Sequence, residues 1–550
     1  MRAIDLYSGV GGWSLGLRLA GVDVIASYER WGPANETNFK NNQHLAQTVD
    51  IRRLALEDLP QDIDIVVGSP PCTQFSFSNR GGSGDLDDGL KDIIHFLEVV
   101  DFLRPKAWAM ENVPRVAPII RKELEAGGQL HKFAHLGIKP HVVNMEDFGV
   151  PQRRRRCIAG NFDFSLLESY SEKMPKHTLG SIIAALAANP VIDPLYNKSI
   201  PASSLIDHCP EAGLNVEEIR INRAGKVTHP VYNAMPFPDR LDRSVRTITA
   251  TCTRVSRESI IIENPIGSFR RLTIRERACL QGFPITFQFY GASYSQKLRM
   301  VGNAIPPIFA FLVAQAFIGR KPEDLPSLSD AAVDLVAPSP PPATTPPDRP
   351  GESYPWNRNF RFAITNLRLK SGVRFELSNK FENENATWRV TFWFGTSKSI
   401  QTFQLNNRLY EQLIADLPTS LAKKLANPLG RLADSIKNAD VSNMQALWSH
   451  HGLGETRAFM LLDELNEIGG LVKSELESQT DIARELVALA IDREYRETAT
   501  MIPGVAKLVR NAPLILAGLI IGSLANTELS MHSDKPMIKI GRTHKIAVNG

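Results

Sequence analysis

Short apolar segments alternate with longer mixed segments over the first part of the chain. Residues 3–7, 23–28, 64–68 and 107–111 each form a short, mostly apolar run, and the stretches between them are long enough for helices. Apolar runs of this length, separated by longer segments, are typical of buried strands joined through helices. The pattern therefore predicts a mostly parallel α/β sheet in this part of the protein.

The pattern changes in the second half of the chain. Apolar residues recur at every second position in three groups, which predicts half-buried antiparallel strands with Gly372 in a turn between the first two. From about residue 407 the apolar period approaches 3.6, which predicts helices, one of them capped by Thr480 or Asp481 and running to about Glu497. The strand groups are Phe360, Phe362 and Ile364; Val373, Phe375 and Leu377; and Trp388, Val390, Phe392 and Phe394, and the helical stripe is Ala458, Leu461, Leu465, Ile468 and Val472.

A proline-rich segment over residues 338–350 separates the two patterns. Such a segment favours extended polyproline geometry and acts as a semi-rigid spacer. The chain has 550 residues, 43% of them hydrophobic and 22% charged, which is typical of a soluble protein with several domains and excludes wholesale disorder. Because the net charge is only +4, any affinity for a polyanion must come from local clusters of Arg and Lys.

The cysteines argue against a disulfide-stapled or zinc-ribbon protein. There are five, widely spaced and without a CxxC pair, so we expect free thiols in a reducing compartment and no metal site. The opening sequence lacks a basic stretch followed by a long apolar run, so no signal peptide is expected. The longest apolar stretch, residues 512–525, is shorter than the roughly 20 residues that span a bilayer. We expect a buried helix there and a cytoplasmic protein.

The first motif that could bind a ligand is a glycine-rich turn between the first predicted strand and a helix. Gly9, Gly11 and Gly12 let the backbone bend tightly and approach a ligand closely. The next predicted strand ends at Glu29, where a carboxylate in this layout accepts both hydroxyls of a ribose. A nucleotide-like ligand is one interpretation. A purely geometric turn beside an exposed glutamate is the other.

Two further motifs lie at the ends of predicted strands, and a third is a run of arginines after Pro151. Pro70 and Pro71 present Cys72 rigidly, which suits a nucleophile better than a buried core thiol. Glu111 ends a strand and suits proton transfer to a bound base, or else a helix cap or salt bridge. Gln152 precedes four consecutive arginines, and strand alternation would send Arg154 and Arg156 to one face. A charge run is usually a solvated face, but this run lies between Pro151 and an apolar segment, which suggests that at least two arginines face an anion.

Together these motifs resemble those of the DNA (cytosine-5) methyltransferase family, in order as well as in content. Residues 271–276 and 280–284 are similar to the family's element that braces the recognition region, and residues 246–250 to a segment bordering that region. Residues 302–307 are similar to the late motif, whose helix packs beside the first helix.

The resemblance implies a site for each part of the reaction. The implied catalytic residues are Cys72, Glu111, Arg154 and Arg156. The implied cofactor is S-adenosyl-L-methionine, bound by Leu6, Tyr7, Ser8, Gly9, Gly11, Gly12, Glu29, Asp50, Ile51, Pro70, Asn303 and Ala304. The implied DNA contacts are Ser76, Arg80, Gln152, Arg243, Arg246, Arg254 and Arg257.

The implied chemistry begins with a cytosine that is flipped out of the duplex. The Cys72 thiolate adds to C6, Glu111 holds or protonates N3, and Arg154, with Arg156 near it, binds the O2 side. One residue departs from the family: Thr73 stands where glutamine is usual, so we expect altered loop contacts and retained chemistry. Residues 79–89 are glycine-rich and are expected to form a mobile lid.

The resemblance also implies a domain layout. A Rossmann-like methyltransferase sheet is expected over residues 1–160 and 270–325, with a small target-recognition region over 161–269 inserted in it. A linker over 326–354 and a C-terminal α+β domain over 355–550 follow, and this last domain lies outside the resemblance. Its strands interleave aromatic residues with Arg361, Arg368, Arg374 and Arg389, which is compatible with a nucleic-acid surface, although a sheet with one face in solvent is the favoured interpretation.

We therefore expect an enzyme that methylates double-stranded DNA in a prokaryotic cell, as the modification component of a restriction or phage-defence system. Its C-terminal domain would then bind protein partners of that system, and no membrane is involved. Two alternatives stay open at this point. One is a transfer-RNA cytosine-5 methyltransferase, which shares these motifs. The other is a catalytically silent DNA-binding regulatory protein that retains the fold.

Overall fold

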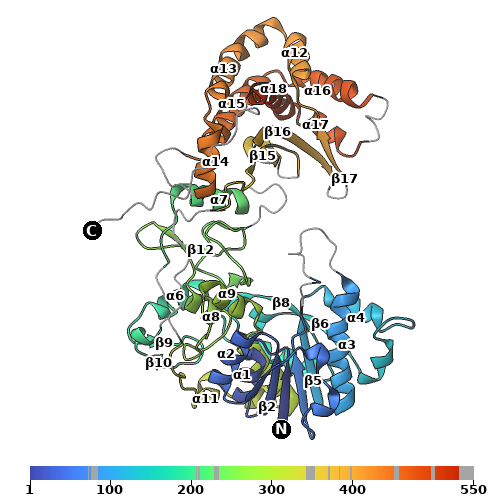
Figure 1. Cartoon of the computed structure of the whole chain (residues 1–550), viewed down its shortest axis with the longest axis vertical. Helices are drawn as coiled ribbons and strands as arrows, with labels where there is room; N and C mark the ends of the chain where they lie inside the picture. Colours follow the sequence, from blue (N-terminus) through green and yellow to red (C-terminus); the bar gives the residue numbers. More distant parts are fainter. Residues whose placement is uncertain are drawn as a thin grey trace. The chain divides into compact units, whose positions relative to one another are not determined.

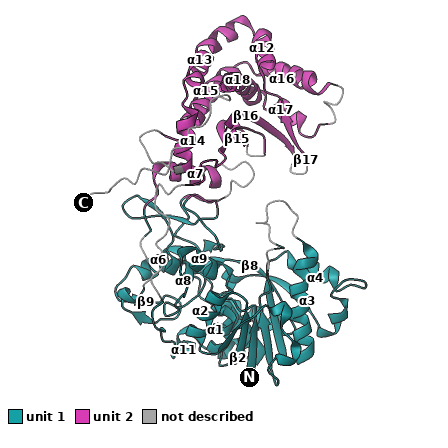
Figure 2. Cartoon of the chain, viewed as in Figure 1, with its two compact units in different colours: residues 1–212, 238–254, 258–347 teal, residues 213–237, 255–257, 348–550 magenta. Residues whose placement is uncertain are grey.

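The computed structural model divides into two compact units, coloured separately in Figure 2. Unit 1 comprises residues 1–212, 238–254 and 258–347, and unit 2 comprises residues 213–237, 255–257 and 348–550. The structure describes residues 1–71, 74–75, 85–205, 207–208, 211–227, 235–341, 354–369, 372–382, 385–396, 399–450, 457–496 and 502–531.

Unit 1 is built on a seven-stranded sheet of order β3-β2-β1-β4-β5-β8-β6 (Figure 1). The five strands from β3 to β5 are parallel, and β8 runs antiparallel to both of its neighbours. The predicted α/β sheet is confirmed, and its four predicted strands correspond to β1, β2, β4 and β5. The strands are β1 (Arg2–Leu6), β2 (Asp23–Glu29), β3 (Leu45–Thr48), β4 (Ile65–Gly68), β5 (Ala107–Asn112), β6 (Lys139–Asn144) and β8 (Arg155–Gly160).

Helices cover both faces of this sheet, as in a Rossmann-like fold. Alternate residues of the central strands pack against α1 and α10 on one face and against α3 and α4 on the other. These helices are α1 (Gly12–Leu19), α3 (Leu86–Leu103), α4 (Val116–Glu123) and α10 (Pro307–Ile318). The other elements of unit 1 are α2 (Gly32–Asn42), β7 (Gln152–Arg153), α5 (Phe164–Ser169), α6 (Leu179–Leu186), β9 (Val191–Ile192), β10 (Ser199–Ile200), β11 (Val245–Arg246), β12 (Ile261–Glu263), β13 (Phe269–Arg271), α8 (Ile274–Leu280), α9 (Tyr294–Asn303) and α11 (Leu328–Ala331).

Glycine lets α1 and α10 approach closely, as expected for a late helix packed beside the first. A Cβ at Gly12 would lie 2.2 Å from the Ile305 carbonyl oxygen, and one at Gly16 would lie 2.4 Å from the Ala310 Cβ. Both distances are far below van der Waals contact, so a side chain at either position would separate the helices.

Gly16→Val is therefore expected to lower the stability of unit 1 by about 1–3 kcal/mol, because overpacking a close contact strains both helices. Thermal unfolding of the purified protein measures the effect as a lower midpoint temperature. Gly32→Ala is the matched control, since a Cβ there meets no atom within 4 Å and its φ is not positive. Equal midpoints for the two variants would contradict the close-packing account.

Unit 2 contains a four-stranded antiparallel sheet of order β14-β15-β16-β17. The three predicted strand groups are confirmed as β14 (Arg361–Arg368), β15 (Arg374–Glu382) and β16 (Asn385–Thr396), and they are followed by β17 (Ser399–Phe403). Gly372 lies between β14 and β15 with φ of 90°, which suits the predicted turn.

The predicted helical half of unit 2 is also confirmed. The stripe Leu461, Leu465, Ile468 and Val472 is buried on α15, and the helix predicted to start near Thr480 is α16. The apolar stretch predicted as a buried helix is α18, which packs on β16 among other helices. The helices are α12 (Asn407–Asp416), α13 (Thr419–Lys437), α14 (Val441–His450), α15 (Met460–Glu477), α16 (Thr480–Tyr495), α17 (Val505–Arg510) and α18 (Ala512–Ser530).

Two helical stretches, residues 294–318 and 512–530, are long and apolar enough to cross a membrane by length and composition. In each, 83% of the most apolar window is buried inside the protein. Burial of this extent is typical of the core helices of soluble proteins, so neither stretch is evidence for a membrane span.

One segment of the predicted recognition region belongs to unit 2. The helix α7 (Val216–Lys226) lies in sequence between two parts of unit 1, yet its Ile221 is buried in the core of unit 2. Arg220 lies 4.2 Å from the centre of the Phe459 ring and forms an ion pair with Asp463. The stretch predicted as one region, residues 161–269, is thus divided between the two units.

Candidate active site

The carboxyl ends of the central parallel strands meet at one edge of the unit 1 sheet. The strand register aligns Tyr28, Leu6, Gly68 and Met110 in a single row across β2, β1, β4 and β5. The residues that follow this row therefore leave the sheet together. This edge is where open α/β sheets bind their ligands.

The glycine loop and Glu29 are joined at this edge. The Gly9 amide donates to Oε2 of Glu29 at 3.1 Å, and the Trp31 amide donates to Oε1 at 2.8 Å. Gly9 and Gly11 have φ of 52° and 86°, and a Cβ at Gly9 would meet no atom within 4 Å. The carboxylate is thus held in place beside open space, and each of its oxygens can accept one more hydrogen bond. This geometry fits the ribose of a nucleoside cofactor.

The remaining predicted cofactor residues surround the same edge. Leu6 and Ser8 are buried, and the Ser8 amide donates to the Tyr28 carbonyl at 3.1 Å. Asp50 follows β3, which pairs with the end of β2, and it caps a short 3-10 helix that begins at the buried Ile51.

Tyr7 and two late-motif residues, Asn303 and Ala304, also belong to the predicted cofactor set. The Tyr7 hydroxyl donates to Asp92, which also pairs with Arg52. Asn303 is exposed at the end of α9, whereas Ala304 is buried beside the Ile305 carbonyl that contacts Gly12. The first and late motifs therefore meet, as the resemblance implied.

Asp5 is buried beneath the glycine loop. Burial raises the pKa of its carboxyl to about 7, although hydrogen bonds from the hydroxyl and amide of Ser14 oppose the shift. The folded protein therefore holds a proton that the unfolded chain releases near its ordinary value of 3.8.

This proton predicts a pH-dependent stability. Between about pH 4 and pH 7 the folded state binds more protons than the unfolded state, so the contribution of Asp5 to stability falls as pH rises, by on the order of a few kcal/mol. Asp5→Asn removes the titration and keeps an acceptor for Ser14. We expect the midpoint of thermal unfolding of the variant, relative to the native chain, to rise from pH 5 to pH 8. A constant difference over this range would contradict the burial argument.

Glu111 and Arg156 form a buried ion pair at the end of β5. The Arg156 Nε lies 2.8 Å from Oε1 of Glu111, and the two side chains are 15% and 8% exposed. The pair forms because Glu111 is opposite Ile158 in the antiparallel register of β5 and β8, which brings the start of β8 beside it. The next residue, Asn112, donates from Nδ2 to the Pro70 carbonyl at 3.1 Å.

These contacts place the approach to the predicted nucleophile beside the carboxylate. Cys72, Thr73, Ser76 and Arg80 themselves lie outside the described residues, so their predicted roles stay predictions. Asn112, whose amide donates to the Pro70 carbonyl, is a site residue that the sequence did not single out. Its signal was the position directly after Glu111, where a side-chain amide can hold the neighbouring strand's loop.

Arg154 lies apart from this pair. Its guanidinium donates to the carbonyls of Ile248, Gly302 and Ala304 at 3.1–3.3 Å, and the side chain is 2% exposed. Strand alternation failed as a guide because β7 ends at Arg153 and β8 begins at Arg155, so the chain is not one continuous strand. In this geometry Arg154 braces the late motif, and Arg156 is the arginine beside Glu111.

Two other cysteines are unsuited to nucleophilic attack. Burial raises the pKa of Cys157 to about 12, and it also raises the pKa of the fully buried Cys279. Both are therefore thiols at neutral pH, whereas attack on an electrophilic carbon requires a thiolate.

Comparison with known families decides the assignment. Residues 1–319 match the model of the C-5 cytosine-specific DNA methylase family. The chain belongs to this family. The match covers more than half of the chain and ends before the proline-rich segment. This methylase is accordingly a DNA (cytosine-5) methyltransferase, and its reaction requires a methyl donor.

Several relatives of this methylase are named Type II methyltransferases. M1.HphI of Haemophilus parahaemolyticus is 29% identical over 57% of this chain and 86% of its own length. M.AplI of Arthrospira platensis is 30% identical over 57% of this chain and 84% of its own. Among solved structures, a putative DNA modification methyltransferase encoded within an E. coli prophage is 22% identical, covers 58% of this chain and 99% of its own, and has a TM-score of 0.41.

Most of the predicted DNA-contacting residues of the methylase are occupied by protein contacts. Gln152 is buried and bonds to Ile248, Leu280 and Gln281. Arg246 pairs with Asp239 and donates to two carbonyls, Arg254 is 1% exposed and donates to the Ala212 carbonyl, and Arg257 donates to the Gly225 carbonyl. Arg243 has a 43% exposed side chain. Among the described members of this set, Arg243 has the most exposed side chain, and it pairs with Asp242 at 3.8 Å.

The predicted lid is only partly described. Residues 79–84 lie outside the described part of the chain, and α3 already begins at Leu86. A Cβ at Gly89 would lie 2.6 Å from the Phe75 ring, so this end of the predicted lid is packed and does not form a loop.

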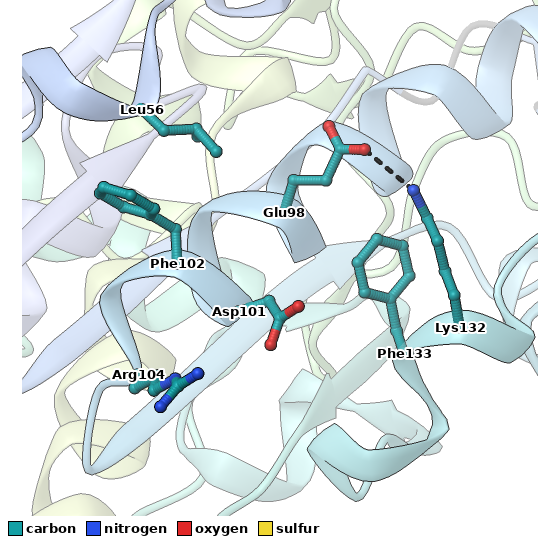
Figure 3. A pocket seen from close by; sticks show the side chains of 7 residues that line it. All are labelled: Leu56, Glu98, Asp101, Phe102, Arg104, Lys132 and Phe133. Carbon is teal, nitrogen blue, oxygen red and sulfur yellow. Dashed lines mark hydrogen bonds and ion pairs between the residues drawn. The ribbon is translucent and has the colours of Figure 1, made fainter.

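A separate recess of about 330 Å³ lies away from this site (Figure 3). Glu98 and Asp101 from α3, with Lys132 and Phe133, contribute to its lining, and Lys132 pairs with Glu98 at 3.0 Å. Since α3 runs back from the loop after β4 to the start of β5, its C-terminal end lies at the amino-terminal edge of the strands. The recess is therefore at the opposite edge from the candidate active site.

Proposed function

We propose that this methylase transfers a methyl group from S-adenosyl-L-methionine to C5 of a flipped-out cytosine in double-stranded DNA, through a covalent bond between Cys72 and C6. The observation that carries the proposal is the buried Glu111–Arg156 pair beside the held Pro70 carbonyl, two residues before Cys72. The cofactor would supply an electrophilic methyl group on a sulfonium.

Binding of the cofactor would fall to the glycine loop, Glu29 and the start of the 3-10 helix at Ile51. The open space at Gly9 and the acceptor capacity of Glu29 support this assignment. Leu6, Tyr7, Ser8, Gly11, Gly12, Asp50, Pro70, Asn303 and Ala304 complete the proposed set.

Activation of the cytosine would fall to Cys72, Glu111 and Arg156. Addition of the thiolate to C6 puts negative charge into the ring, and this charge can be relieved only if N3 is held or protonated. Arg156 occupies Oε1 of Glu111, which leaves Oε2 to carry the proton that the carboxyl group shares with N3 of the base and passes to it as the thiolate adds. The Arg156 guanidinium would also face the O2 side of the ring, a role that Arg154 would support through the position of the late motif.

The names of the relatives support a wider role. Because several are Type II methyltransferases, we propose that the enzyme modifies host DNA in a restriction or phage-defence system, inside a prokaryotic cell. Protein partners bound through unit 2 belong to the same proposal.

Bisulfite sequencing of DNA from cells that express the protein tests this function and reports the target sequence. We expect protected cytosines within one short recognition sequence, and none with Cys72→Ser. Methyl transfer to transfer RNA, measured beside transfer to plasmid DNA with the purified enzyme, tests the RNA alternative. Incorporation into transfer RNA alone, or into neither substrate, would overturn the proposal.

A further inference from the structure

We infer that the face of the unit 2 sheet opposite α15 and α18 binds the phosphate backbone of double-stranded DNA, at a site separate from the methylation site. The inference goes beyond the proposed function and rests on it only for the identity of the polyanion. Residue alternation, strand register and charge carry it.

The two faces of the sheet differ sharply in character. On β15, Phe375 and Leu377 are buried in the core of unit 2 with α18. The alternate residues Glu376, Ser378 and Lys380 point to the other face. In Figure 1 the helices α15 and α18 lie on the first side of the sheet. The second face contains a recess of about 190 Å³.

The register brings cations and hydroxyls together on the second face. Arg361 of β14 and Arg389 of β16 are both paired with Ser378, which lies between them on β15. The side chain of Arg361 is 58% exposed, and the side chain of Arg389 is exposed and makes no hydrogen bond or ion pair to any described residue. Lys380 and Thr391 line the same recess.

A carboxylate and an indole hold two of the arginines in place. Glu376 pairs with Arg361 at 2.5 Å and with Arg374 at 3.0 Å, and both guanidinium groups lie 5.6 Å from the centre of the Trp393 ring. Arg361 is therefore pre-organised, which lowers the entropy cost of binding an anion. Three cations line the recess, Arg361, Lys380 and Arg389, together with one carboxylate, Glu376. Just outside the lining, Arg374 pairs with Glu376, and Glu382 pairs with Lys380 at 3.0 Å.

This chemistry matches a phosphodiester backbone. Contacts to DNA phosphates come mainly from Arg, Lys, Ser and Thr side chains, and they carry little sequence information. DNA is the polyanion to which the other unit's activity already brings the chain.

The test uses the full-length protein and a short fluorescent duplex of alternating dA and dT, which contains no cytosine. Fluorescence anisotropy over a range of salt concentrations gives the affinity and its salt dependence. For Arg361→Ala/Arg389→Ala we expect at least about tenfold weaker binding at low salt, and a slope of log K against log salt that is smaller by about 2, because each phosphate contact contributes about 0.9. Arg389→Glu, which leaves the Arg361–Glu376 pair intact, is expected to weaken binding as well.

Arg408→Ala is the matched control, since Arg408 is an exposed arginine of α12 without a hydrogen bond or ion pair to any described residue. Unchanged affinity and slope in the double variant would overturn the inference, as would a loss confined to duplex RNA of equivalent sequence. Methyl transfer is measured separately. If the native protein never methylates DNA but the double variant loses binding, the proposed function fails and this inference stands.

Discussion

Arg156→Ala is expected to lower kcat for methyl transfer by about 10²–10³-fold, while Arg154→Ala acts mainly on stability. Arg156 is the described cation beside Glu111, and loss of one preorganised donor to a developing negative charge costs about 3–4 kcal/mol. Arg154 instead bonds to three backbone carbonyls, so its removal should lower the unfolding temperature.

Single-turnover incorporation of a labelled methyl group separates these effects from substrate binding. Thermal unfolding of both variants is the control, because breaking a buried ion pair can itself cost about 3–5 kcal/mol. Arg156→Lys should recover part of the rate, since it keeps the charge and loses the planar guanidinium. A rate within threefold of the native value for Arg156→Ala would contradict the role assigned to the Glu111–Arg156 pair.

Deletion of residues 348–550 is expected to abolish methylation, although the family match ends at residue 319. The deletion removes the partners of α7: the core around Ile221, the Phe459 ring under Arg220, and Arg457, which pairs with Glu217 at 2.9 Å. Exposure of one buried isoleucine costs about 1.5–3 kcal/mol, and the ring contact adds about 0.5–2 kcal/mol. The sum is a large part of the stability of a typical domain.

The decisive control also removes residues 213–237, the segment of unit 2 that the truncation leaves without its partners. A chain that lacks residues 348–550 and has a short Gly-Ser linker in place of residues 213–237 should be soluble and cooperatively folded, since both deleted parts belong to unit 2. The simple truncation should aggregate and transfer no methyl groups to DNA. If residues 1–347 alone methylate DNA at the native rate and sites, α7 has no structural dependence on unit 2.

The sequence predicted the elements whose apolar pattern is strong. The runs that became β1, β4 and β5 are buried along their whole length or nearly so, and α15 keeps its stripe in the core. The strand β3 was not predicted because none of its four residues is buried. An edge strand of this kind has no apolar signal to recognise.

The order of the active-site motifs along the chain was predictable, whereas the contacts that their side chains make were less so. Glu29 and Glu111 could be placed at the sheet edge because each ends a strand. The separate positions of Arg154 and Arg156 depend on a break between β7 and β8 that no local pattern indicates. Arg246 and Arg254 were predicted to contact DNA because they are arginines in the recognition region, but their donors are used by protein acceptors, which is a tertiary property.

Trapping of a covalent complex tests the central claim most directly. Duplex DNA made with 5-fluorocytosine in place of every cytosine contains any short target, and fluorine at C5 prevents release of the attacking thiol. With S-adenosyl-L-methionine, the native protein should form a denaturant-resistant complex, with the cytosine attached to the peptide containing residue 72, and Cys72→Ser should form none. Attachment at another residue, or no complex from protein that methylates ordinary DNA, would contradict the account.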